Sequence, residues 1–341
     1  MLRKTLILTA FVVASPLSSF AASISQIVAF GDSLSDNGNA ASATGGALPG
    51  NYAPNALTDG PMTTPPTSGP FGLWIDQFAK KLGVPDPQPF IAGGTNYAVA
   101  SAKTGHNPAF TLPPFPPTMV PYTSDQVALY LFTQTVSASS LYTFWAGSND
   151  INQSPTPAAA LTAAVTGAGN VKSNIQTLAA KGATQFLWFN EPLLGGTPLG
   201  RASGPAGVAA LNAASKAFNA EWASDIAMLQ AQGIMVTGVN IEQLFTQITT
   251  NPSQYGFMNV TDPAGCQFAQ SLPGCATNNP NQFLFWDGEH PTTAADAQIA
   301  TFALNTLNGP ATVPEPGSLG LALGGLGIGL VLNAKRRRTV K

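Results

Sequence analysis

Four short apolar runs recur along the chain, and each stops at glycine or at polar residues that favour turns. Runs of this kind are typical of buried strands, here at residues 27–30, 141–145, 185–189 and 234–239. Between and after them, apolar residues return at three- and four-residue spacing, which predicts helices at residues 71–82, 124–135, 158–181, 206–232, 242–249 and 292–307. Strands that alternate with helices form a parallel sheet with helices on both faces. The sequence contains no internal repeat and no second core, so we predict one domain over residues 23–308.

Two segments lack this periodicity. Residues 40–69 are rich in Gly, Pro, Asn and Thr, and we expect them to form a long surface loop. Asn107 to Tyr122 contains six prolines, which exclude a helix or an inner strand there. Its Phe110 and Phe115 leave two alternatives open, a stiff apolar wall beside a pocket or a proline-rich surface loop.

The N-terminus has the layout of a secretory signal peptide, which we place at residues 1–21. Arg3 and Lys4 precede an apolar run from Leu6 to Val13, and small residues suited to cleavage follow near Ala21. A transmembrane anchor is the alternative, but the apolar run is too short to span a bilayer comfortably.

Charged residues make up only 9% of the 341 residues, and their distribution matters more than their sum. Two of the 14 Lys and Arg lie in the leader and five in the last seven residues, whereas all 16 Asp and Glu lie between the leader and the apolar tail. The body between these ends therefore has seven basic and 16 acidic residues, a net charge near −9. Such a charge argues against nucleic acid as a partner.

Cys266 and Cys275 lie close together in a loop rich in Pro, Gly and Asn. In an oxidising compartment we expect them to form a disulfide, which would stabilise the fold by roughly 2 to 3 kcal/mol. A metal site is the alternative. The whole chain has only two cysteines and two histidines as ligands for such a site, so we expect no metal site.

The first predicted strand leads into Gly31-Asp32-Ser33-Leu34-Ser35-Asp36. Ser33 then follows the carboxyl end of a parallel strand, where ligands bind in open α/β sheets. Asp32, Ser35 and Asp36 can cap the N–H groups of a following helix, which would place Ser33 where negative charge is favoured. An ordinary strand-to-helix turn with an N-cap serine is the alternative.

A nucleophilic serine needs a base, and only His106 and His290 exist. His106 has no carboxylate nearby in the sequence to orient it. His290 follows Asp287 by three positions, and on a tight turn that carboxylate can accept a hydrogen bond from one ring nitrogen while the other faces the serine. We therefore predict His290 as the base.

Acyl transfer also needs donors for a developing oxyanion. The candidates are the Ser33 N–H, the Asn149 side chain after the apolar run at 141–145, and a backbone N–H in the short strand or turn of small residues from Gly94 to Ala102. For Asn149 a helix N-cap is the alternative, because Ser148, Asn149 and Asp150 all have capping side chains.

Four segments of the chain, at residues 31–36, 94–98, 147–150 and 287–291, resemble in order the four conserved sequence blocks of the GDSL, or SGNH, esterase/lipase family. The resemblance implies a flavodoxin-like three-layer α/β/α sandwich with a central parallel sheet. It implies Ser33 as nucleophile, His290 as base, Asp287 as its partner, and Ser33, Ser101 and Asn149 around the oxyanion. No cofactor is expected. The second block usually has glycine where this chain has Ser101, so we carry Ser101 over for its backbone N–H only.

The C-terminal residues 309–341 resemble a PEP-CTERM sorting signal of Gram-negative bacteria. Pro314-Glu315-Pro316 is followed by an apolar segment at 319–332 and a basic end at 335–341. The resemblance implies a transient membrane helix recognised by an exosortase, and export through the inner membrane to the cell envelope or extracellular matrix. A plain C-terminal anchor is the alternative.

Together these features predict an exported serine esterase or lipase that acts through an acyl-enzyme on Ser33. The apolar loop favours lipid esters as substrates, whereas the sorting tail favours acyl groups on polysaccharide. A catalytically silent envelope or matrix-binding protein on the same fold is an alternative of another class.

Overall fold

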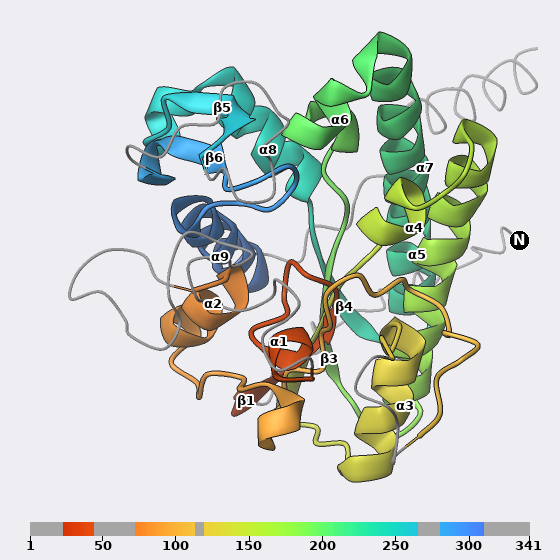
Figure 1. The fold of residues 1–341 in the computed structure, drawn as a ribbon. Coiled ribbons are helices and arrows are strands. Elements are labelled where there is room, and N and C mark those ends of the chain that lie inside the picture. The colour runs from red at the N-terminus through yellow and green to blue at the C-terminus, as the bar shows by residue number, and fades with distance from the viewer. Residues whose placement is uncertain (1–22, 44–71, 113–118, 265–279, 310–341) are drawn as a thin grey trace, which may run out of the picture.

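The computed structural model describes residues 23–43, 72–112, 119–264 and 280–309. A parallel sheet of four strands lies at its centre, in the order β1-β2-β3-β4 (Figure 1). The strands are β1 (Gln26–Gly31), β2 (Ser140–Trp145), β3 (Gln185–Phe189) and β4 (Met235–Val239). All four were predicted from the apolar runs, and they are confirmed within one or two residues at their ends.

A fifth chain segment lies along the free edge of β1. The Ala29 N–H donates to the Thr95 carbonyl at 3.0 Å, and the Tyr97 N–H donates to the Ala29 carbonyl at 2.8 Å. With this segment counted as the second strand, the spatial order is 2-1-3-4-5, which is the flavodoxin-like order. The predicted fold class is therefore confirmed.

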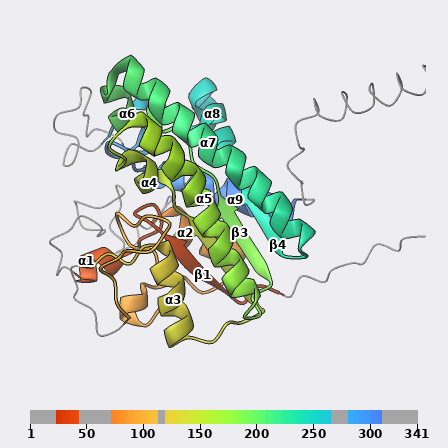
Figure 2. The same ribbon diagram turned by 90° about the vertical axis from the view of Figure 1, so that its right-hand side faces the viewer.

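Helices cover both faces of the sheet, as Figures 1 and 2 show. One face is covered by α3 (Thr123–Thr133), α5 (Pro157–Ala179) and α7 (Gly204–Ala231), and the other by α2 (Trp74–Leu82), α8 (Ile241–Thr250) and α9 (Thr293–Asn308). Because side chains alternate along a strand, Val28 and Phe30 of β1 pack into the first layer and Ile27 and Ala29 into the second. This alternation gives three layers with two hydrophobic cores.

Several short elements were not predicted. They are α1 (Asn39–Ala43), α4 (Ser148–Asn152), α6 (Pro198–Ala202) and a small parallel sheet of β5 (Asn259–Pro263) and β6 (Phe283–Phe285). Helix α1 begins where a loop was expected, and this corrects the start of that loop. Elements of three to five residues are too short for an apolar period to show in the sequence, so contacts with the rest of the fold determine them.

Some predictions fall outside the described residues. These are the signal peptide, the sorting tail, most of the loop at 40–69, Phe115 and the cysteine pair Cys266 and Cys275. They stay predictions. Within the described ranges, no helix is both long and apolar enough to cross a bilayer.

Candidate active site

Ser33 lies in the turn directly after β1, and Gly31 determines how closely that strand end approaches β2. A Cβ atom at Gly31 would lie 2.4 Å from the carbonyl oxygen of Trp145, so only glycine fits there. Gln126 of α3 holds the same residue, since its Oε1 accepts the Gly31 N–H at 2.9 Å and its Nε2 donates to the Gly31 carbonyl at 2.8 Å. The starting point of the Ser33 turn is therefore fixed.

Two buried carboxylates shape the turn, and of these only Asp36 caps the following helix as the sequence suggested. Asp32 Oδ1 accepts the Leu34 N–H at 3.0 Å. Asp36 accepts from the N–H groups at the start of α1 and, at 2.7 Å, from the Ala100 N–H. Ser35 differs from the expectation, because its hydroxyl accepts from the Trp74 indole at 3.1 Å and caps no helix. Asp36 thus ties the Ser33 turn to the loop that contains Ser101.

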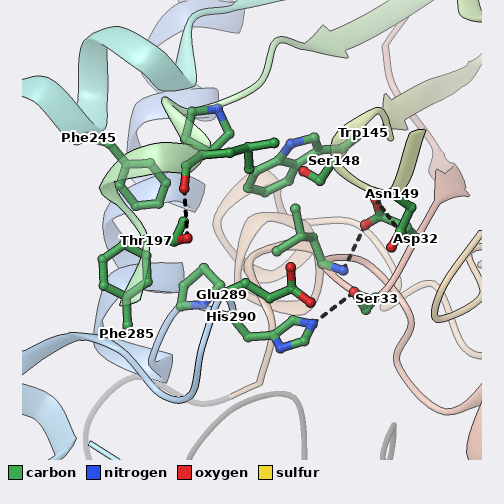
Figure 3. Close-up of a pocket in the computed structure, with 14 residues that line it drawn as sticks. Asp32, Ser33, Trp145, Ser148, Asn149, Thr197, Phe245, Phe285, Glu289 and His290 are labelled. Atoms are coloured by element: carbon green, nitrogen blue, oxygen red, sulfur yellow. Dashed lines mark hydrogen bonds between the residues drawn. The ribbon is translucent and has the colours of Figure 1, made fainter. Parts of the chain in front are cut away.

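The structure brings Ser33, His290 and Asp287 into one hydrogen-bonded series, of which Figure 3 shows the bond between Ser33 and His290. His290 Nε2 lies 2.8 Å from Ser33 Oγ, and His290 Nδ1 lies 2.7 Å from Asp287 Oδ2. The other oxygen of Asp287 accepts the backbone N–H groups of Glu289 and His290 at 2.9 and 2.8 Å. The tight turn expected from the Asp287-to-His290 spacing is present, and it orients the imidazole toward the serine.

The charges of Asp287 and His290 shift the pKa values of both side chains. Burial alone would lower the pKa of His290, but the Asp287 carboxylate opposes it and raises that pKa to about 9. Burial likewise opposes ionisation of Asp287, but His290 and the two backbone N–H donors outweigh it and hold the pKa of Asp287 below its ordinary value. The environment therefore favours an imidazolium beside a carboxylate.

His106 is not among the residues that line the pocket at Ser33, which is described below. The expectation that no carboxylate orients it is wrong, because Asp125 of α3 lies 2.8 Å from its Nδ1. The two residues are 19 positions apart, so the pairing depends on the fold and is not visible in the sequence. The His106 side chain is 73% exposed.

The candidate oxyanion donors come from three segments that meet beside Ser33. Asn149 lies in the first turn of α4 and lines the pocket, and the N-cap position of that helix is Gly147, so the capping alternative for Asn149 is wrong. The Asn149 side-chain amide donates to the Ala102 carbonyl at 3.0 Å and makes a longer contact of 3.4 Å with Asp32 Oδ2. The longer contact is weak enough to be exchanged for a substrate oxygen.

Asp150 fixes the loop that supplies the other donor. Its two oxygens accept the Thr104 N–H at 3.0 Å and the Thr104 hydroxyl at 2.9 Å. The N–H groups of Ser33 and Ser101 make no hydrogen bond to any residue that the structure describes. Both donors are therefore available to a ligand.

Ser101 has a φ of +66°, which makes it the one non-glycine residue with positive φ in the described ranges. This is the left-handed conformation that glycine adopts without strain, whereas a side chain there costs roughly 1 kcal/mol or more. The chain thus keeps the backbone conformation of a glycine at a position where it has serine. The sequence showed the departure but not the conformation.

The pocket at Ser33 occupies about 460 Å³, its open mouth included. Its wall is mostly apolar, with Leu34, Trp145, Pro192, Leu194, Phe245, Phe285 and Pro291. Phe110 is not among the lining residues, so the predicted apolar wall is not formed by the described part of its segment. No group of three or more metal-ligating side chains occurs in the described residues.

Glu191, which the sequence reasoning missed, lies buried behind the pocket. The Ser148 hydroxyl donates to its Oε2, and its Oε1 has no hydrogen-bond partner among the described residues. Burial, with a smaller contribution from the nearby Asp32, raises the pKa of Glu191 to about 8. Burial also raises the pKa of Asp32 to about 7. Glu191 lies two residues after the end of β3, a position that could have marked it as a site residue.

A serine, a histidine and an aspartate joined in this order at the carboxyl edge of a parallel sheet define the serine hydrolase class. The chain belongs to the GDSL-like lipase/acylhydrolase family, whose model matches residues 27–302.

Individual relatives are distant. A thermolabile hemolysin of Vibrio parahaemolyticus is 26% identical over 84% of this chain, and an uncharacterised protein of Pseudomonas putida is 27% identical over 84%. The chain spans 64% and 49% of these two relatives. A solved structure of a putative GDSL-like lipase from Parabacteroides merdae has a TM-score of 0.44 at 12% identity, covering 83% of this chain and 95% of the other.

The titration of Glu191 predicts how stability depends on pH. Between its ordinary pKa of 4.5 and its folded value of about 8, the folded protein holds a proton that the unfolded chain has released. The free energy of unfolding should therefore fall as pH rises through this range. Glu191→Gln should flatten that fall by up to about 1.4 kcal/mol per pH unit, measured by urea unfolding at several pH values.

Glu221→Gln on α7 serves as the control for loss of one carboxylate. A pH dependence in Glu191→Gln as steep as that of the wild type would show that Glu191 is ionised in the folded protein at neutral pH.

Proposed function

We propose that this protein hydrolyses carboxylic esters through an acyl-enzyme on Ser33. The observation that carries the proposal is the unbroken series from Asp287 through His290 to Ser33 at the mouth of an apolar pocket. Membership of the GDSL-like lipase/acylhydrolase family supports the same chemistry.

In the first step, Ser33 Oγ attacks the carbonyl carbon of the ester while His290 Nε2 takes the hydroxyl proton. The distance of 2.8 Å between these atoms allows direct transfer. Asp287 holds the ring with Nδ1 protonated and stabilises the imidazolium that forms.

The carbonyl oxygen becomes negatively charged in this step. Ser33 and Asn149 line the pocket. The N–H groups of Ser33 and Ser101 and the Asn149 amide would donate to this oxygen. Asp150 holds the loop at Thr104, and the Ala102 carbonyl holds the Asn149 side chain. These donors therefore need little rearrangement before the reaction.

The intermediate then collapses. The bond from the carbonyl carbon to the alcohol oxygen breaks, and His290 returns its proton to that oxygen, which leaves as the alcohol. Water attacks the Ser33 acyl ester with His290 again as base, and the carboxylic acid is released as Ser33 recovers its proton.

The lining of the pocket favours an apolar acyl or lipid ester as substrate, because aromatic and aliphatic side chains dominate its wall. Acyl groups on polysaccharide are the second candidate, supported by the resemblance of the C-terminal tail to a sorting signal of bacteria that make exopolysaccharide. A silent binding protein is the alternative of another class, and it would lack a reactive serine.

Ser33→Ala and His290→Ala should each abolish ester hydrolysis while the protein remains folded. Each change removes a group that takes part in bond making and leaves the two hydrophobic cores intact. Hydrolysis of nitrophenyl butyrate gives the rate, and labelling with a fluorophosphonate probe reports the activated serine independently.

His106→Ala is the matched control, because it removes the other histidine of the chain. A variant lacking His290 that keeps most of its activity, together with loss of activity in His106→Ala, would overturn the assignment of the base. Absence of labelling in the wild type would instead favour the silent binding protein.

The raised pKa of His290 predicts an alkaline rate profile. The base must be neutral to accept the serine proton, so kcat/KM should rise with pH until about 9. Asp287→Asn removes the charge that raises this pKa, and the midpoint of the profile should move to lower pH while the rate falls. A midpoint that stays in place in Asp287→Asn would show that another group controls the profile.

Substitutions at Asn149 and at Ser101, the two predicted oxyanion donors outside the Ser33 turn, should affect kcat differently. Asn149→Ala deletes a side-chain donor and should lower kcat by about 10² to 10³. Ser101→Ala keeps the backbone N–H and should be nearly neutral in kcat, whereas Ser101→Gly should also raise the free energy of unfolding by about 1 kcal/mol because it relieves the left-handed strain. Steady-state kinetics and urea unfolding measure both effects. A loss in Ser101→Ala equal to that in Asn149→Ala would place the Ser101 hydroxyl in catalysis or substrate binding.

A further inference from the structure

A second pocket adjoins the one at Ser33. It occupies about 690 Å³ with its open space included, and among the described residues it is formed by the short helix Leu194–Gly196, α6, α7, α8 and β6. Four residues line both pockets, namely Pro192, Thr197, Phe245 and Phe285. The two spaces are therefore separated by one layer of side chains.

Two aromatic rings make up most of this partition. Phe245 of α8 and Phe285 of β6 stack with ring centroids 6.1 Å apart and an interplanar angle of 26°. Figure 3 shows both rings at the end of the first pocket that lies away from Ser33 and Asn149. A chain that extends from the serine in this direction reaches the two rings.

Several polar side chains in the second pocket bond to the protein itself, whereas the exposed residue Arg201 also lines it. Asn212 Oδ1 accepts the Gly195 N–H at 3.0 Å, and Glu242 Oε2 accepts from Asn219 at 2.8 Å. Thr197 donates to the Leu194 carbonyl at 2.8 Å. Apart from Arg201, the surface left for a ligand is mainly apolar, contributed by side chains such as Leu193, Val208 and Leu284 together with the two phenyl rings.

We propose that the second pocket binds the distal part of the apolar chain of a long-chain ester whose carbonyl group lies at Ser33. This inference rests on the proposed ester hydrolysis. A short chain ends within the first pocket, whereas a long chain continues past Phe245 and Phe285. Burial of its outer methylenes then favours long-chain esters over short ones, since each methylene removed from water adds to binding.

Filling the second pocket tests this proposal. Gly196 lines only the second pocket, has no positive φ, and an added Cβ there would meet no atom within 4 Å. Gly196→Phe should therefore place a ring in the pocket without a backbone clash. The ratio of kcat/KM for nitrophenyl decanoate to that for nitrophenyl butyrate should fall at least about tenfold, because losing the burial of two methylenes accounts for roughly that factor.

Two further variants make the comparison specific. Gly169→Phe on α5 is the control, since an added Cβ there also meets nothing within 4 Å and Gly169 lines neither pocket. Its decanoate-to-butyrate ratio should equal that of the wild type. Thr246→Trp on α8 fills the second pocket from the opposite side and replaces Gly196→Phe if that variant does not fold.

The chain could belong to the acid or to the alcohol of the ester, and two substrate series separate these. The first varies the acyl chain of nitrophenyl esters, and the second varies the alcohol chain of acetates from butyl to decyl, each below the concentration at which micelles form. A selective loss in either series supports the proposal and identifies which part of the ester enters.

Unchanged ratios in both series, in Gly196→Phe and in Thr246→Trp, would overturn the second-pocket proposal while the wild-type rate on butyrate upholds ester hydrolysis. If the wild type hydrolyses no ester of either series and resists the fluorophosphonate probe, the proposed function itself fails, and the inference with it.

Discussion

The close approach of β1 and β2 at their carboxyl ends is the constraint on which the site depends. Gly31 faces the Trp145 carbonyl with no room for a side chain, and Gln126 bonds both backbone groups of that glycine. Ser33 and Asn149 leave the sheet at this one edge, only a few residues beyond the contact. Any residue larger than glycine would spread the two strands and move the serine away from the amide that faces it.

Beneath this edge lies a group of carboxyls with few countercharges. Burial raises the pKa values of Asp32, Glu191 and Asp150 to about 7, 8 and 6, while the charges of His290 near Asp32 and of Lys103 near Asp150 oppose the rise. The negative charge of an ionised Asp32 favours a proton on the His290 imidazole, and a positive imidazole favours ionisation of Asp32. The chemistry at Ser33 is thus coupled to the ionisation of these buried carboxyls.

Much of the fold follows from local pattern. The strands and long helices have clear apolar periods, and the Asp287-to-His290 spacing showed how an imidazole could be oriented. Pairings across long separations were not visible, among them His106 with Asp125, Gln126 with Gly31, and Phe245 with Phe285. The left-handed backbone at Ser101 was also hidden, because residue type usually reveals such a conformation only when it is glycine. Sequence thus identified the chemical groups, and tertiary contacts decided their surroundings.

The hydrogen bond between Ser33 and His290 joins residues 257 positions apart. A ribosome makes the serine near the beginning of the domain and the histidine near its end, so the nucleophile exists for most of synthesis without its base. Because His290 lies just before α9, the bond cannot form until the segment that contains this histidine has been made. The hydrogen-bonded series of Ser33, His290 and Asp287 is thus completed late in synthesis.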